Sequence, residues 1–201
     1  MYKRQFNTMS QNLDRFRMWF SDPLEFFQHK KPLTPPERHD RFNGAFLAMS
    51  LGLFLFERFY RIKSGTHDVE PKPNTTGKDW DAEFKKYASS DLNIDLEFLT
   101  AFWTVFRNGV QHQGMPKRVH RGYKNQGKIW HYWDISVDYP ALPAVHWINS
   151  TEMVICISPW KFAEFMIQKF DAEPAMLDQG FNHAFGEIRA GAPYSCAPVP
   201  V

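Results

Sequence analysis

The sequence predicts a mainly α-helical protein, a helical bundle with a β-hairpin inserted late in the chain. Apolar residues recur at spacings of three and four along several stretches, which is typical of helices that bury one face. One stretch near residue 130 alternates with period two instead, which is typical of a strand. The chain has 201 residues, of which 43% are hydrophobic and 23% charged. This is enough for one well-packed core.

The helices can be placed from their apolar stripes and their end signals. The expected helices, in chain order, cover residues 11–29, 36–63, 79–88, 92–114, 159–170 and 174–188. A break is expected at residues 21–23, where a proline can begin a new first turn. Thr34 is expected to cap the second helix, and Asp91 or Asn93 the fourth. Ser158, which stands directly before a proline, predicts a clean start for the helix that follows.

Two strands are expected between the last two long helices. Residues 129–137 alternate with period two, and residues 145–157 supply a second apolar stretch. With a turn region at residues 139–143 between them, the two form the predicted β-hairpin. We expect a single domain over residues 1–189, which includes this hairpin at about 129–157, followed by a flexible tail over 190–201.

Composition and charge exclude several classes of protein. A formal net charge of +2 does not by itself mark a nucleic-acid binder. Cys156 and Cys196 are the two cysteines, and they provide neither a disulfide framework nor zinc-ligand spacing, which suits a reducing cytoplasm. The most apolar run, residues 45–56, is well short of the roughly 20 residues that span a bilayer. We therefore expect a soluble cytoplasmic protein that uses neither a metal nor another cofactor.

The end of the 92–114 helix is the candidate catalytic site. Its apolar stripe consists of Leu96, Leu99, Phe102, Trp103, Phe106 and Val110. Arg107, Asn108 and His112 interrupt that stripe. Around the axis of an ideal helix, Asn108 and His112 are about 40° apart, whereas Arg107 and His112 are about 140° apart. The arginine side chain must therefore bend back to reach His112. An arginine can bind phosphate oxygens and stabilise a phosphorane, and a histidine can transfer a proton near neutral pH. These groups suffice for metal-independent cleavage of RNA by its own 2′-hydroxyl, with Asn108 positioning the phosphate.

A basic stretch follows this helix. From Arg107 to Trp133 the sequence contains no Asp or Glu. The basic residues beyond Arg107 are Lys117, Arg118, Arg121, Lys124 and Lys128. Tyr123 and Trp130 add rings that can stack on bases. The stretch predicts contacts with an RNA backbone, and the alternative is a solvated loop whose charges only keep the surface hydrated.

The order Arg107-Asn108-x-x-x-His112, late in an arrangement of four or five helices, resembles the signature of the HEPN superfamily. The run from Phe106 to Pro116 looks like the version found in HEPN-like bacterial proteins in which a β-hairpin and a further helix follow. The likeness covers about residues 92–170. It implies a HEPN-like helical bundle, face-to-face dimerisation and, in active members, metal-free endoribonuclease activity. In that pattern Arg107 and His112 are the catalytic pair and Asn108 is the polar helper. A dimer also has a physical motive, because one histidine cannot readily serve as both acid and base.

Three hypotheses stay open from the sequence. The first is a metal-independent endoribonuclease that acts at a homodimer cleft. The second is a catalytically inactive HEPN-like module that binds RNA, a nucleotide or a protein partner. The third is a purely structural bundle, in which Arg107 and His112 are both satisfied within their own chain, with Arg107 bound by a carboxylate such as Asp91 or Asp95.

Other reactive or aromatic residues have simpler interpretations. His120, His131 and His146 lack the carboxylate pattern and tight spacing of a metal site, so they are interpreted as ordinary strand and loop residues. Cys156 is interpreted as a small buried hydrophobic residue. Four tryptophans are expected to pack the hairpin against a helix, or to cover part of a dimer interface, namely Trp130, Trp133, Trp147 and Trp160.

Overall fold

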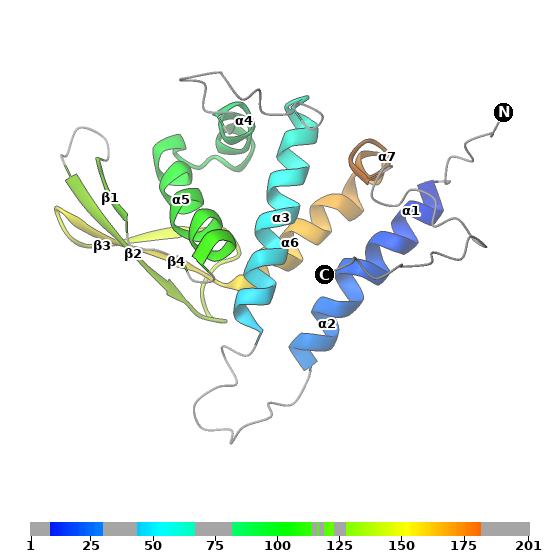
Figure 1. The fold of residues 1–201 in the computed structure, drawn as a ribbon, viewed down its shortest axis with the longest axis horizontal. Coiled ribbons are helices and arrows are strands. Elements are labelled where there is room, and N and C mark those ends of the chain that lie inside the picture. Colours follow the sequence, from blue (N-terminus) through cyan, green and yellow to red (C-terminus); the bar gives the residue numbers. More distant parts are fainter. Residues whose placement is uncertain are drawn as a thin grey trace, which may run out of the picture.

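A computed structural model describes residues 9–29, 44–66, 82–113, 116, 119–122 and 128–181. Within these residues the protein is mostly helical, with one small sheet, as the sequence predicts. Figure 1 shows the sheet on one side of the molecule and most of the helices on the other. The helix that carries the candidate catalytic residues contacts both the sheet and the other helices.

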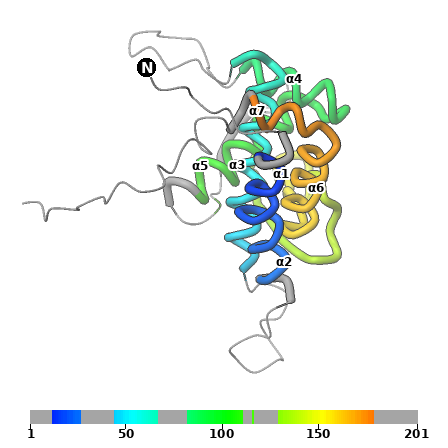
Figure 2. Tube along the Cα trace, turned by 90° about the vertical axis from the view of Figure 1, so that its right-hand side faces the viewer, coloured from blue at the N-terminus to red at the C-terminus, as the bar shows by residue number. Residues whose placement is uncertain are grey.

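The N-terminal segment forms α1 (Met9–Phe16) and α2 (Asp22–His29), joined by one π-helical turn at Arg17–Ser21. In that wide turn the Asp22 N–H donates to the Arg17 carbonyl, five residues back. The prediction for residues 21–23 is correct in that α2 begins at Asp22, but the expected break is wrong, because the chain stays helical from Met9 to His29. Figure 2 shows these helices alongside α3 (Ala45–Lys63) and α6 (Pro159–Ala172). Ring contacts bind them there, with Phe16 5.2 Å from Phe170 and Phe20 5.9 Å from Phe54 between centroids.

The predicted start of the second helix is wrong and its predicted end is correct. Gly44 has a left-handed backbone, with φ of 73°, and the helix begins only after it, at Ala45. A left-handed residue cannot continue a right-handed helix, so no helix runs unbroken from Pro36 to Lys63. Thr34 and the rest of residues 30–43 lie outside the described residues.

The next two helices are α4 (Ala82–Leu92) and α5 (Leu96–Gln113). Leu92 closes α4 and does not begin the helix that follows. Asn93 then turns the chain with φ of 52°, and Asp95 caps α5 by accepting the Phe98 N–H at 3.0 Å. The predicted caps, Asp91 and Asn93, are therefore wrong. Several residues of this region have cap-forming side chains, and only the position of the left-handed turn selects one.

The β structure is a four-stranded mixed sheet in the order β1-β2-β4-β3. Its strands are β1 (Val119–Gly122), β2 (Lys128–Ile135), β3 (Ala144–Asn149) and β4 (Glu152–Ile157). The predicted hairpin between 129–137 and 145–157 is wrong, because β2 pairs with β4 in parallel and not with β3. Residues 145–157 form two antiparallel strands, and Asn149 Oδ1 accepts the Thr151 N–H at 2.8 Å in the turn between them. Periodicity locates strands, but it does not select their partners.

The C-terminal helices agree with the prediction where they are described. Ser158 caps α6 by accepting the Lys161 N–H, and Pro159 is its first residue. α7 (Ala175–Phe181) follows. The remainder of the predicted 174–188 helix and the 190–201 tail lie outside the described residues. In the described residues, no helix has the length and apolar character needed to cross a membrane.

The core is built from large rings of the helices and from the inner face of the sheet. Its largest fully buried aromatic side chains are Phe16, Phe56, Phe59, Tyr60, Phe84, Phe102, Trp103, Phe106, Phe162 and Phe170. α3 and α6 approach closely at Gly52, where an added Cβ atom would lie 2.5 Å from Phe162 Cδ1. The prediction that the four tryptophans pack in the core is only partly correct. Trp133 packs on Phe46, but Trp130 and Trp147 are 37% and 36% exposed.

Candidate functional site

The apolar stripe of α5 fixes the position of the candidate catalytic residues. Leu99, Phe102, Trp103 and Phe106 are buried, as predicted, whereas Leu96 is 38% exposed at the first turn. Arg107 and Asn108 follow directly after Phe106. Because burial of the Phe106 ring fixes the rotation of α5 about its axis, it also fixes the directions in which these two side chains project. Both side chains are partly buried.

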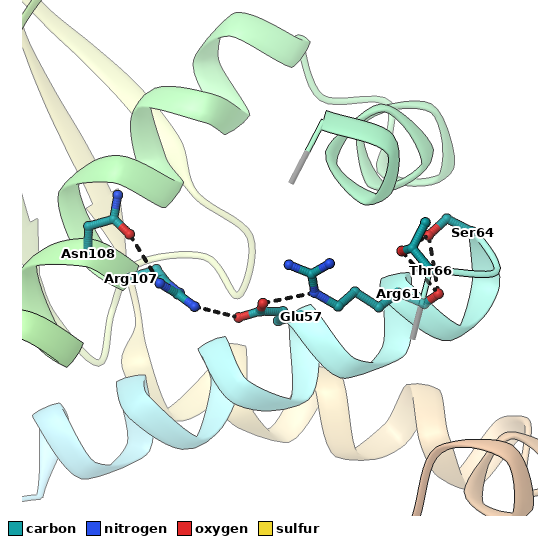
Figure 3. Close-up of polar contacts among 6 residues, drawn as sticks. All are labelled: Glu57, Arg61, Ser64, Thr66, Arg107 and Asn108. Carbon is teal, nitrogen blue, oxygen red and sulfur yellow. Dashed lines mark hydrogen bonds and ion pairs between the residues drawn. The ribbon is translucent and has the colours of Figure 1, made fainter. Parts of the chain in front are cut away.

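Arg107 is bound on two sides. Its Nη2 atom lies 3.4 Å from Glu57 Oε2 on α3, and its Nη1 atom lies 3.4 Å from Asn108 Oδ1 (Figure 3). The guanidinium carbon lies 5.7 Å from the centroid of the Trp103 ring. The Arg107 side chain remains 25% exposed. Its Nε atom is buried and has no hydrogen-bond partner among the described residues. The guanidinium group is thus contacted on two sides, in a side chain that is partly open to solvent.

Glu57 also binds a second arginine. Its Oε1 atom accepts the Arg61 Nε–H at 2.9 Å, one helical turn further along α3. Arg61 in turn covers the ring of Phe84 on α4, at 4.8 Å from the guanidinium carbon to the ring centroid. Figure 3 shows the carboxylate between the two guanidinium groups. A single partly buried carboxylate therefore contacts two guanidinium groups that come from different helices.

Sequence reasoning did not single out Glu57 or Arg61, although one signal was available. Glu57 is the only acidic residue of α3, in an otherwise apolar and basic helix. Its spacing of four from Arg61 predicts an ion pair within the helix. Its contact with Arg107 joins residues 50 apart in the chain, which only the packing of α3 against α5 can produce.

The two carboxylates that the structural hypothesis named do not contact Arg107. Asp91 accepts hydrogen bonds from Tyr60 Oη at 2.7 Å and from Lys169 Nζ at 2.5 Å. Burial of Asp91 opposes its ionisation, but the hydrogen bonds from Lys169 and Tyr60 outweigh burial and lower its pKa. Asp95 caps α5. An intrachain carboxylate does bind Arg107, as that hypothesis requires, but it is Glu57.

None of the remaining predicted site residues has a side chain in the described part of the structure. His112 belongs to the last turn of α5, and its side chain lies outside the described part of the structure. Arg121 and Lys128 are strand positions in β1 and β2, the two strands that contact α5. The other predicted RNA-binding residues, Lys117, Arg118 and Lys124, lie outside the described residues. The structure therefore brings Arg107 and Asn108 together and adds Glu57 and Arg61 to them.

The other candidates keep their simpler interpretations where they are described. His131 is buried on the inner face of the sheet and His146 is exposed on β3. No group of three or more His, Cys, Asp or Glu side chains within the described ranges could hold a metal ion. Cys156 is half-buried, less than predicted, and burial raises the pKa of its thiol, so it is not an activated nucleophile.

The chain was compared with protein-family models, with characterised proteins and with solved structures. None of these comparisons gives a match.

Proposed function

We propose that this protein is a metal-independent endoribonuclease of the HEPN type, with a HEPN-like bundle fold and a catalytic cleft formed by two copies of the chain. The observation that carries the proposal is the presentation of Arg107. Its guanidinium group is held by Glu57 and Asn108, its side chain is 25% exposed, and it belongs to the same helix as His112. An arginine that is held in place about one and a half helical turns before a histidine provides the two functional groups that the sequence motif requires.

The chemistry follows from those parts. The RNA 2′-hydroxyl attacks the adjacent phosphorus, which breaks the bond to the 5′-oxygen and leaves a cyclic phosphate. His112 of one copy accepts the hydroxyl proton and His112 of the other copy protonates the leaving oxygen. Arg107 stabilises the charge that develops on the phosphorane, and Asn108 orients the phosphate. The basic residues that follow α5 attract the RNA backbone.

The test is cleavage of a mixed set of single-stranded and hairpin RNAs in the presence of EDTA. Wild type should cleave and leave cyclic-phosphate ends. His112→Ala and Arg107→Ala should each lose at least about a hundredfold in rate while remaining folded. Arg17→Gln is a suitable control, since Arg17 is also paired with a carboxylate, Asp171, but lies away from α5. Cleavage that persists in both site variants would refute the proposal.

The second candidate is the catalytically inactive module that binds RNA, a nucleotide or a protein partner. One observation favours it. Glu57 already occupies one edge of the Arg107 guanidinium, so that part of its charge is neutralised within the chain. RNA binding that depends on Arg107, without any cleavage of the RNA set, would support this candidate over the nuclease.

A further inference from the structure

We propose that β3 is an interface between two copies of this chain, in which the two β3 strands pair antiparallel across a two-fold axis and join both sheets into one. This interface goes beyond the proposed function and does not depend on it. α5 contacts β1 and β2, whereas β3 forms the edge of the sheet opposite β1. The interface at β3 is therefore separate from the proposed catalytic cleft.

β3 is an edge strand that pairs, among the described residues, with β4 alone. Figure 1 shows the sheet on the opposite side of the molecule from α1 and α2. In a strand, the N–H and C=O groups that do not face the neighbouring strand point outward, where a further strand can bind them. No described residue outside the sheet forms a backbone hydrogen bond with β3. Its outer edge thus offers a row of donors and acceptors to an added strand.

The composition of β3 lacks the charged residues and prolines that usually protect an edge strand from association. Its six residues include no Asp, Glu, Lys, Arg or Pro. They expose apolar side chains instead, with Val145 38%, Trp147 36% and Ile148 55% exposed. The opposite edge strand, β1, has only four residues, and one of them is Arg121. Of the two edges, β3 is therefore the one suited to pairing with another chain.

The position of the two-fold axis follows from the neighbours of β3. Its regular pairing with β4 covers residues 144–147, and an irregularity in register follows. Opposite residues of an antiparallel pair share a face, so an axis perpendicular to the sheet places one residue opposite itself. An axis at Val145 would place Trp147 opposite Pro143, which has no N–H to donate. An axis at His146 keeps the three central residues clear of both Pro143 and the irregularity.

With this axis, β3 complements itself. Val145 and Trp147 lie opposite Ile155 and Met153 of β4, which are fully buried, so both belong to the inner face of the sheet. Across the axis, Val145 of one copy faces Trp147 of the other, and the same pair forms twice. Pairs of an aromatic and a β-branched residue stabilise antiparallel strands. On the outer face His146 of each copy faces the other, and no charged side chain of β3 opposes the contact. A second copy of this chain is therefore the partner that fits.

The first experiment uses the symmetry of the axis. Self-association of the full chain is measured by sedimentation velocity over a micromolar concentration series, because an interface of one strand is small. His146→Lys alone and His146→Glu alone should each raise the Kd of wild-type association at least about tenfold, since like charges then face each other. An equimolar mixture of the two variants should regain the association. Absence of self-association in wild type, or a mixture no tighter than either variant alone, would overturn the inference.

Thr151 provides the matched control, because it is exposed in the turn beyond the end of β3. Thr151→Lys and Thr151→Glu add the same charges away from the axis and should associate as wild type does. A dimer formed through the proposed cleft is common to all these proteins, so only the differences between them concern β3. In addition, His146→Cys should form a disulfide-linked dimer on mild oxidation, since opposite Cα atoms of paired strands lie about 5 Å apart. Thr151→Cys should not, and equal cross-linking of the two would count against this register.

Hydrogen exchange of the β3 amides in wild type separates the second copy from other occupants of this edge. Exchange should slow as the concentration of the whole chain rises, because ladder hydrogen bonds protect the amides. Protection by an added peptide of residues 144–149, without protection at high chain concentration, would assign the edge to an extended segment of another protein. Protection that is already complete at high dilution would show that the edge is covered within its own chain. Either of these two results would overturn the inference.

Discussion

The contact between Glu57 and Arg107 predicts a measurable coupling energy. At 3.4 Å and an effective dielectric constant of about 20, two unit charges attract each other by about 5 kcal/mol. The side chains are 18% and 25% exposed and the contact is long, so desolvation and solvent screening offset most of this attraction. We expect a net coupling of about 1 to 2 kcal/mol in the free energy of unfolding.

A double-mutant cycle measures that coupling. Glu57→Gln, Arg107→Gln and the double variant are compared with wild type by urea unfolding, and the non-additive part of the four free energies is the coupling. The contact of Glu57 with Arg61 is lost in both variants that carry Glu57→Gln, so its contribution cancels from the cycle. The more exposed pair of Arg17 and Asp171, at 3.7 Å, serves as the comparison and should give less than about 0.5 kcal/mol.

A small coupling energy between Glu57 and Arg107 would refute the reasoning. If the coupling of Glu57 to Arg107 is below about 0.3 kcal/mol, the two substitutions are additive and the side chains are not paired in solution. The Arg107 guanidinium would then lack the anchor on which the proposed catalytic site depends.

Two further predictions concern the framework that holds the site. Gly52→Ala should lower the free energy of unfolding by about 2 kcal/mol, and so lower Tm by about 4 to 8 °C, because its Cβ atom would lie 2.5 Å from the Phe162 ring. Thermal melts should show partial recovery when Phe162→Leu is added, and an unchanged Tm in Gly52→Ala would contradict the close packing of α3 on α6. Asp91 has a lowered pKa in the folded protein, so its contribution to stability is full above the unfolded pKa of about 4 and is lost as the pH falls through the folded value. Between pH 6 and pH 2, the free energy of unfolding measured with urea should therefore fall less in Asp91→Asn than in wild type. An equal fall in both proteins would count against the hydrogen bonds from Tyr60 and Lys169.

Local signals in the sequence account for much of the secondary structure. The spacing of three and four along α5 predicts the buried face that contains Phe102 and Phe106, and both are buried. Ser158 before a proline predicts the first turn of α6, and period two predicts β2. Each of these features depends on residues within a few positions of one another, which is why the chain alone reveals them.

Features that depend on distant partners were not predictable in the same way. The pairing of β2 with β4 in parallel, rather than with β3, involves a choice between strands of similar apolar character. The helix start after Gly44 and the cap at Asp95 depend on which residues adopt left-handed conformations, and several neighbours had suitable side chains. Sequence patterns reduce the number of possible strand partners and helix ends, but tertiary packing selects among them.

The same distinction between local and long-range features applies to the candidate site. The sequence by itself determined that Arg107 and Asn108 adjoin on one helix, with His112 a turn further on, because helical geometry fixes the relation of near neighbours. Only the tertiary structure decided that Glu57 is the carboxylate that binds Arg107, and that Arg61 shares it. An ion pair between residues 50 apart forms because the buried faces of α3 and α5 pack together, and no local pattern specifies which charges at the borders of those faces will meet.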